Sequence, residues 1–178
     1  MSLRNAGCGL TVLLLCLTSH FSLRGQTPRS GPHYIPPAVN IGLTYLGVDT
    51  DLGPSVAAEV TYLGTTPRIW RTGVIGGLIA STQGTVYGYG GLHLPIPLPL
   101  GLFARPSFSV GLYEKGQGME LGHTLEFRSS FALERAFSDG LRVSTMLYHL
   151  SNAGLGFKNP GLEAVGVAVA VPLSTGAR

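Results

Sequence analysis

The sequence predicts an all-β protein, an eight-stranded antiparallel transmembrane β-barrel. Charged residues make up only 12% of the 178 residues, about half of the ~25% typical of soluble domains. Beyond the N-terminal segment, no stretch is apolar over the ~18 residues that indicate a membrane-spanning helix. Short runs of alternating apolar and polar residues recur instead between turn-forming residues. An apolar, exported chain without a membrane helix is typical of a membrane β-barrel.

The N-terminal segment has the pattern of an export signal. Arg4 gives it a positive charge, and residues 10–17 form an apolar core that is shorter than the ~20 residues a spanning helix needs. We therefore predict a cleaved signal peptide over residues 1–25. A lipid anchor on Cys16 is the alternative, disfavoured because the preceding residue is bulky. Cys8 and Cys16 both lie in this segment, so we expect a mature chain without disulfides or a cysteine-based metal site.

The rest of the chain divides into a leader, a barrel and a tail. Residues 26–38 are rich in Pro, Gly and Ser and predict a flexible leader, residues 39–173 the outer-membrane barrel, and residues 174–178 a short tail. Most of the predicted strands have the ~9–11 residues, or slightly more, that a tilted membrane strand needs, and eight is the smallest usual number in outer-membrane barrels. The predicted strands are residues 39–48, 55–64, 69–80, 85–94, 100–113, 119–133, 141–151 and 162–172.

Alternation along the strands indicates which face meets lipid. Side chains of a strand point alternately to its two faces, and each strand here has one apolar and one polar face. A soluble lipocalin-like barrel would need a well-charged exterior, whereas the polar faces here carry few charges of both signs. These suit a narrow lumen in which opposite charges pair, and we expect Glu126 and Arg128 to pair there. In the sixth strand the apolar face holds Met119, Leu121, Leu125, Phe127, Phe131 and Leu133.

Three residues capable of hydrolytic chemistry share the outer face at one rim. His149 and Ser151 fall on the apolar face of the seventh strand, and Glu163 shares the face of the valines in the eighth. Pairing Ser151 roughly opposite Glu163 preserves that parity. Polar groups are costly on a lipid-facing wall, and together these three supply a nucleophile, a base and a carboxylate that orients the base. Taken singly, a His or Ser near the end of a strand more often caps it or lies in the membrane interface than takes part in catalysis.

The C-terminal third resembles the PagL-type lipid A 3-O-deacylases. The resemblance is carried by the segments His149–Gly154 (HLSNAG) and Asn159–Glu163 (NPGLE), with Gly122 and residues 126–128 (EFR). It implies an eight-stranded outer-membrane barrel with a Ser-His-Glu triad. Carried over by motif, His149 is the base, Ser151 the nucleophile and Glu163 the orienting carboxylate. The Asn152 side chain and the Gly154 N–H would then form the oxyanion hole.

The resemblance further implies a serine esterase of the bacterial outer membrane. We expect it to hydrolyse the 3-position acyl ester of lipid A without a metal or organic cofactor. With both termini in the periplasm, the loop before the eighth strand is extracellular, where lipopolysaccharide lies. The partners are then lipopolysaccharide and outer-membrane lipids, and a homodimer remains open. A net charge of +3 without a basic run argues against nucleic acid. The alternatives are a non-catalytic structural or adhesive barrel, and a hydrolase acting on phospholipid.

Overall fold

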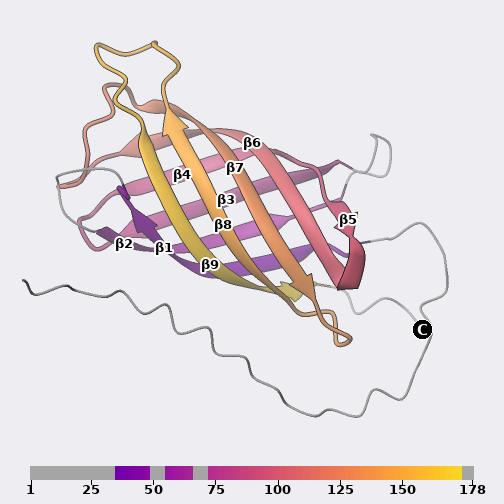
Figure 1. Ribbon diagram of the computed structural model, residues 1–178. Helices are drawn as coiled ribbons and strands as arrows, with labels where there is room; N and C mark the ends of the chain where they lie inside the picture. The colour runs from indigo at the N-terminus through magenta and orange to yellow at the C-terminus, as the bar shows by residue number, and fades with distance from the viewer. Residues whose placement is uncertain (1–34, 49–54, 66–71, 174–178) are drawn as a thin grey trace, which may run out of the picture. The chain divides into compact units, whose positions relative to one another are not determined.

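The computed structural model describes residues 35–48, 55–65 and 72–173. The predicted signal peptide, most of the leader, the C-terminal tail and the predicted start of the third strand lie outside these residues. The described part is almost entirely β-structure (Figure 1). Its strands are β1 (Ala38–Leu46), β2 (Ser55–Leu63), β3 (Gly73–Ser81), β4 (Val86–His93), β5 (Ile96–Leu98), β6 (Leu102–Glu114), β7 (Leu125–Ala136), β8 (Arg142–Ser151) and β9 (Leu162–Pro172).

The eight long strands close into an antiparallel barrel. The hydrogen-bonded order is β4-β3-β2-β1-β9-β8-β7-β6-β5, and a further pairing of β4 with β6 closes the ring. The first and last strands pair along their whole length, from Ala38 opposite Pro172 to Leu46 opposite Ala164. Closure leaves no long strand with an unpaired edge, as a lipid environment requires. The all-β, eight-stranded prediction is thereby confirmed.

Two predicted strands begin elsewhere in the structure, and the predicted start of a third lies outside the described residues. The described part of the third strand starts at Gly73, and the sixth starts at Leu125 rather than at residue 119. The fifth is interrupted, because β5 pairs with the beginning of β6 and a single 3₁₀ turn, η1 (Pro99–Gly101), joins them. Among the described residues, no helix has the length and apolar character to cross a membrane.

The outer wall is apolar and the lumen is polar, as the alternation predicts. In β9, the odd-numbered valines are exposed and the even-numbered residues face inward. Exposed Leu, Ile, Val, Phe and Tyr side chains occur on the outer faces of the long strands, with Leu43 59% and Leu112 65% exposed. The inward face carries fully buried Glu126, Arg128 and Tyr148. This inversion of the usual soluble pattern is that of a transmembrane barrel.

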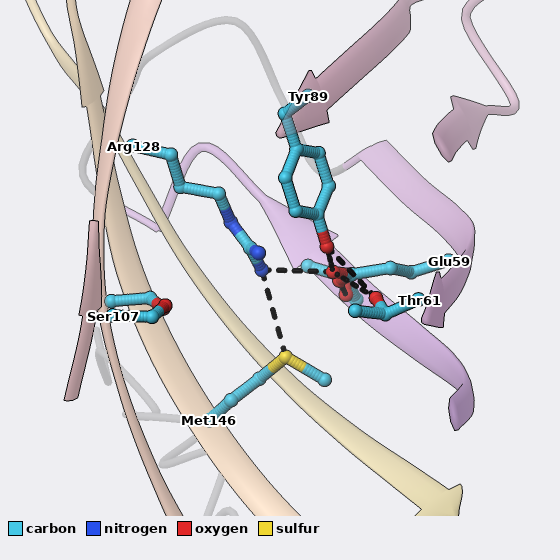
Figure 2. A network of polar contacts seen from close by, with 8 residues as sticks. Glu59, Thr61, Tyr89, Ser107, Arg128 and Met146 are labelled. Carbon is cyan, nitrogen blue, oxygen red and sulfur yellow. Dashed lines mark hydrogen bonds and ion pairs between the residues drawn. The ribbon is translucent and has the colours of Figure 1, made fainter. Parts of the chain in front are cut away.

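A buried ion pair crosses the middle of the lumen (Figure 2). Arg128 Nη2 on β7 lies 2.9 Å from Glu59 Oε1 on β2, and both side chains are 2% exposed. Glu59 also accepts hydrogen bonds from the Tyr89 hydroxyl at 2.6 Å and from Thr61 at 3.1 Å. The guanidinium lies between aromatic rings, 4.6 Å from the centroid of Tyr89 and 4.0 Å from that of Tyr148. Shared hydrogen bonds of this kind offset the cost of burying the two charges.

The predicted Glu126–Arg128 pair is wrong. Both side chains point into the lumen, but they are neighbours on the same face of one strand, and the long guanidinium reaches across the barrel to Glu59 instead. The carboxylate oxygens of Glu126 form no hydrogen bond within the described part of the chain. A second ion cluster lies nearer the other end of the lumen, where Glu134 contacts Arg105 and Arg142. Two layers of paired charge therefore lie in the interior.

Candidate active site

The β8–β9 pairing brings a histidine and a glutamate together on the outer wall. His149 stands directly opposite Glu163 in the register, and Nδ1 of the imidazole lies 2.7 Å from Glu163 Oε1. The imidazole is 42% exposed and the carboxylate 53%. The sequence analysis placed Ser151 roughly opposite Glu163, whereas His149, two residues earlier, is the residue that pairs with it. The prediction that these residues share the outer face is consistent with this register. A carboxylate bonded to Nδ1 leaves Nε2 as the nitrogen free to exchange a proton.

The backbone around Glu163 is held by the neighbouring strand β1. The Glu163 carbonyl accepts hydrogen bonds from the Gly47 N–H at 2.9 Å and the Val48 N–H at 3.1 Å, just beyond the end of β1. These bonds continue the β1–β9 ladder past Leu46, which pairs with Ala164. The carboxylate that contacts His149 is thus carried by a firmly paired part of the barrel rather than by a free loop.

Ser151 is the last residue of β8 and lies on the same outer face as His149. It pairs with Phe127 of β7, is half-buried, and is separated from His149 by one inward-facing residue, Leu150. Within the described residues, no hydrogen bond joins the Ser151 hydroxyl to His149. The structure therefore brings His149 and Glu163 into contact and places Ser151 beside them on one face of β8.

The loop after Ser151 is organised around the buried side chain of Asn152. Its Nδ2 donates to the Leu121 carbonyl at 2.7 Å and to the Lys158 carbonyl at 2.8 Å, while Oδ1 accepts from the Gly154 N–H at 2.9 Å. Asn152 is 0% exposed. The sequence predicted the Asn152 amide and the Gly154 N–H as oxyanion-hole donors, and in this conformation both are engaged within the loop.

Two further features of this loop were missed at the sequence level. Asn159 accepts the Asn152 backbone N–H on its side-chain oxygen at 3.0 Å, so it fixes the residue after Ser151 as well as forming a turn. Ala153 adopts a left-handed conformation with φ 55°, which is uncommon for a residue other than glycine and is characteristic of functional loops. The Asn-Ala-Gly and Asn-Pro-Gly patterns signalled turns but not these partners.

The β6–β7 loop contacts the β8–β9 loop at the same rim. Leu121, expected on the outer face, is instead buried at 1% exposure, because the chain there is loop rather than strand. Glu120 accepts from the Gly122 N–H at 3.0 Å and pairs with Lys115 at 2.9 Å. The hydrogen bond from Lys115 and that from Gly122 lower the pKa of Glu120 below its usual value. His123 is exposed and accepts the Leu125 N–H on Nδ1, with no contact to the His149–Glu163 pair.

An apolar groove of about 600 Å³ runs along the outer wall beside the histidine–glutamate pair. It begins at the next outward-facing residue of each strand, which is Leu147 in β8, two residues before His149, and Val165 in β9, two residues after Glu163. The groove continues away from the loops and is lined mainly by apolar residues of five strands, with Thr44 and Thr145 among them. Its lining includes Leu43, Val56, Phe131, Leu133, Leu147 and Val167. The site thus combines polar chemistry at the rim with a surface suited to an acyl chain.

Comparison with known proteins identifies the family. A family model described as lipid A 3-O-deacylase (PagL) matches residues 45–172, which is most of the chain. The chain belongs to the PagL family. Its members are lipid A 3-O-deacylases, so the predicted hydrolase activity on lipid A is confirmed, and the alternative of a structural or adhesive barrel gains no support.

A solved structure has the same architecture. The crystal structure of the outer membrane enzyme PagL matches 76% of this chain and 99% of that chain, with a TM-score of 0.64 and 16% sequence identity. At that identity the likeness shows a shared barrel fold. No curated protein matches the sequence. The PagL family resemblance inferred from the HLSNAG and NPGLE segments is therefore confirmed by the family model, and the solved structure adds the shared barrel fold.

Proposed function

We propose that this PagL-family deacylase hydrolyses lipid A as a serine esterase, with Ser151 as nucleophile, His149 as base and Glu163 as the orienting carboxylate. The 2.7 Å contact between His149 Nδ1 and Glu163 Oε1 is the observation that carries the proposal. It fixes the tautomer that leaves Nε2 unprotonated and able to accept the serine proton. Ser151 is the hydroxyl on the same outer face of β8, one outward position from the imidazole.

The reaction proceeds through an acyl-enzyme. Ser151 Oγ attacks the ester carbon at the 3-position of the glucosamine while its proton passes to His149 Nε2. The bond between the acyl carbon and the sugar oxygen then breaks, and the sugar oxygen takes the proton from His149. Water next attacks the acyl-serine, with His149 receiving its proton and returning one to Ser151. The products are 3-O-deacylated lipid A and a 3-hydroxy fatty acid.

The oxyanion hole requires a change in the loop that follows Ser151. We propose Asn152 and Gly154 as its donors, as the family motif implies. The Gly154 N–H now donates to Asn152 Oδ1, and both Asn152 amide hydrogens are directed at backbone carbonyls. A negatively charged oxygen is a stronger acceptor than these neutral groups, so substrate attack would draw the donors away from them.

The substrate would be approached from the bilayer. The apolar groove places an acyl chain along the lipid-facing wall, with its ester at the rim beside His149. The barrel itself is filled by buried side chains, which leaves the outer wall as the accessible face. Location in the bacterial outer membrane, with this rim in the outer leaflet, would bring the site to lipopolysaccharide.

Mass spectrometry of lipid A tests the proposal directly. Expression of the wild-type protein in a host with 3-O-acylated lipid A should remove one 3-hydroxyacyl mass, and Ser151→Ala should abolish that loss. Ser138→Ala is the matched control, because Ser138 is exposed on the turn between β7 and β8 at the other end of the barrel. Retention of deacylation by Ser151→Ala, with normal folding, would overturn the nucleophile assignment. Release of fatty acid from phospholipid alone would redirect the substrate.

A further inference from the structure

Gly161 lies two residues before Glu163, just beyond the rim end of the β8–β9 ladder. Leu150 pairs with Leu162 at the end of the β8–β9 ladder. The next residues toward the rim are Ser151 on β8 and Gly161 on the other side, so Gly161 lies across from the proposed nucleophile. It has φ +74°, in the left-handed region, where glycine is strongly favoured.

The imidazole of His149 rests directly on Gly161. A Cβ atom built at Gly161 would lie 2.7 Å from Cε1 of His149, 3.5 Å from Nε2 and 3.6 Å from Nδ1. A carbon–carbon approach of 2.7 Å is well inside the ~3.5–4.0 Å of optimal contact. The edge of the ring that carries both nitrogens therefore passes over the bare Cα of Gly161. Any side chain there would displace the ring.

The contact with Glu163 opposes a retreat of the ring from Gly161. Nδ1 is held by Glu163 at 2.7 Å, and Glu163 is held through its backbone carbonyl by Gly47 and Val48. Movement of the imidazole away from Gly161 would therefore stretch its bond to the carboxylate. Two contacts, one to Glu163 and one to Gly161, together constrain where Nε2 lies.

We propose that Gly161 is a positioning residue for catalysis. Because it has no side chain, the imidazole of His149 can lie over its Cα, next to the position of Ser151. This inference rests on the proposed roles of Ser151 and His149. It gives a reason for a glycine at position 161 in addition to the conformation of the turn. A methyl group at position 161 shifts Nε2 relative to the serine hydroxyl while leaving all three reacting residues present. A misplacement of about 1 Å in a catalytic group lowers the rate by roughly 100-fold.

The test compares Gly161→Ala with a control that has the same backbone strain. Gly84, in the β3–β4 loop, has φ +76°, and a Cβ there meets nothing closer than 3.9 Å. Gly84→Ala therefore reproduces the cost of placing alanine in the left-handed region without the clash. Both variants are assayed as full-length protein in detergent micelles with purified lipid A as substrate, and their thermal unfolding is followed by circular dichroism.

We expect Gly161→Ala to lower kcat by about 100-fold with KM changed by less than about threefold, because the ring is displaced while the substrate groove is intact. Gly84→Ala should lose comparable thermal stability and keep kcat within about twofold of wild type. A Gly161→Ala enzyme with the kcat of Gly84→Ala would overturn the inference. If Ser151→Ala also stays active, the proposed mechanism itself fails, whereas an inactive Ser151→Ala beside an active Gly161→Ala removes only the role of Gly161.

A measurement on the wild-type protein covers the case in which Gly161→Ala does not fold. In micelles, the nuclear Overhauser spectrum should show a strong cross-peak between the His149 Hε1 proton and a Gly161 Hα proton, because Cε1 lies over that Cα. Absence of the cross-peak, with both resonances assigned, would show that the ring lies elsewhere and would overturn the inference without any variant.

Discussion

Replacement of Glu163 by glutamine tests how much the carboxylate contributes to the rate. The amide is nearly isosteric and can still accept the Nδ1–H on its oxygen, so the geometry of His149 should persist. What is lost is the negative charge 2.7 Å from the imidazole, which in the proposed mechanism stabilises the imidazolium formed when Ser151 gives up its proton. A hydrogen bond to a charged group contributes about 1.5–3 kcal/mol. At about 1.36 kcal/mol per tenfold in rate, this predicts a fall in kcat of roughly 10- to 150-fold.

That magnitude is smaller than in buried triads, where the equivalent change costs about 10⁴-fold. Glu163 is 53% exposed on the outer wall, so its charge is only partly shielded from its surroundings. Glu163→Gln should change kcat in a lipid A deacylation assay and leave KM nearly unchanged, because Glu163 is not among the residues that line the groove. Glu114→Gln, at an exposed rim position of β6, is the control. A Glu163→Gln enzyme with wild-type kcat would refute the reasoning.

Three further changes probe the barrel and the loop. Arg128→Met should destabilise the barrel by about 3–5 kcal/mol in urea unfolding, because it leaves the Glu59 carboxylate buried without its cation; the double variant with Glu59→Gln should recover part of that loss. Asn152→Ala should lower kcat by about 10²–10³-fold if the amide serves the oxyanion, and a smaller effect would assign it to the loop alone. Since hydrogen bonds lower the pKa of Glu120, its contribution is present at neutral pH and is lost as pH falls through that lowered pKa. Glu120→Gln should remove this acid-dependent loosening in hydrogen exchange of the β6–β7 loop.

Strand parity was predictable from the sequence, but strand register was not. Alternation has a period of two, so the outer face of His149, Ser151 and Glu163 could be read directly from their positions. Register depends on how the loop of residues 152–161 folds. That loop is set by the contacts of Asn152 with Leu121 and Lys158, of which one partner lies in another loop. A shift of two residues preserves parity, and for that reason the pattern alone could not place His149 rather than Ser151 opposite Glu163.

The start of β7 and the ion-pair partners of the charges in the lumen could not be predicted from the sequence, for a similar reason. The apolar pattern from Met119 onward continues that of the strand, yet Gly122 with φ +95° breaks the extended chain. A Cβ on Gly122 would lie 2.3 Å from the Lys158 carbonyl, so the break allows two loops to pack closely. Arg128 likewise pairs with Glu59, which is 69 residues away in the sequence. Inward-facing residues on opposite walls of a narrow barrel come into contact whatever their separation along the chain.

The buried charges of the lumen give a physical reason for the proposed site to lie on the outer wall. Arg128 and Glu59 cross the barrel in one layer, and Glu134 bridges Arg105 and Arg142 in another. These side chains are almost completely buried, and opening a path between them would separate paired charges in a low-dielectric interior. A substrate whose acyl chains already lie in the bilayer needs no such path. The wall then has to supply only a groove for the chain and a few polar residues at its rim, and β8 and β9 supply both by placing His149 and Glu163 one outward position from Leu147 and Val165.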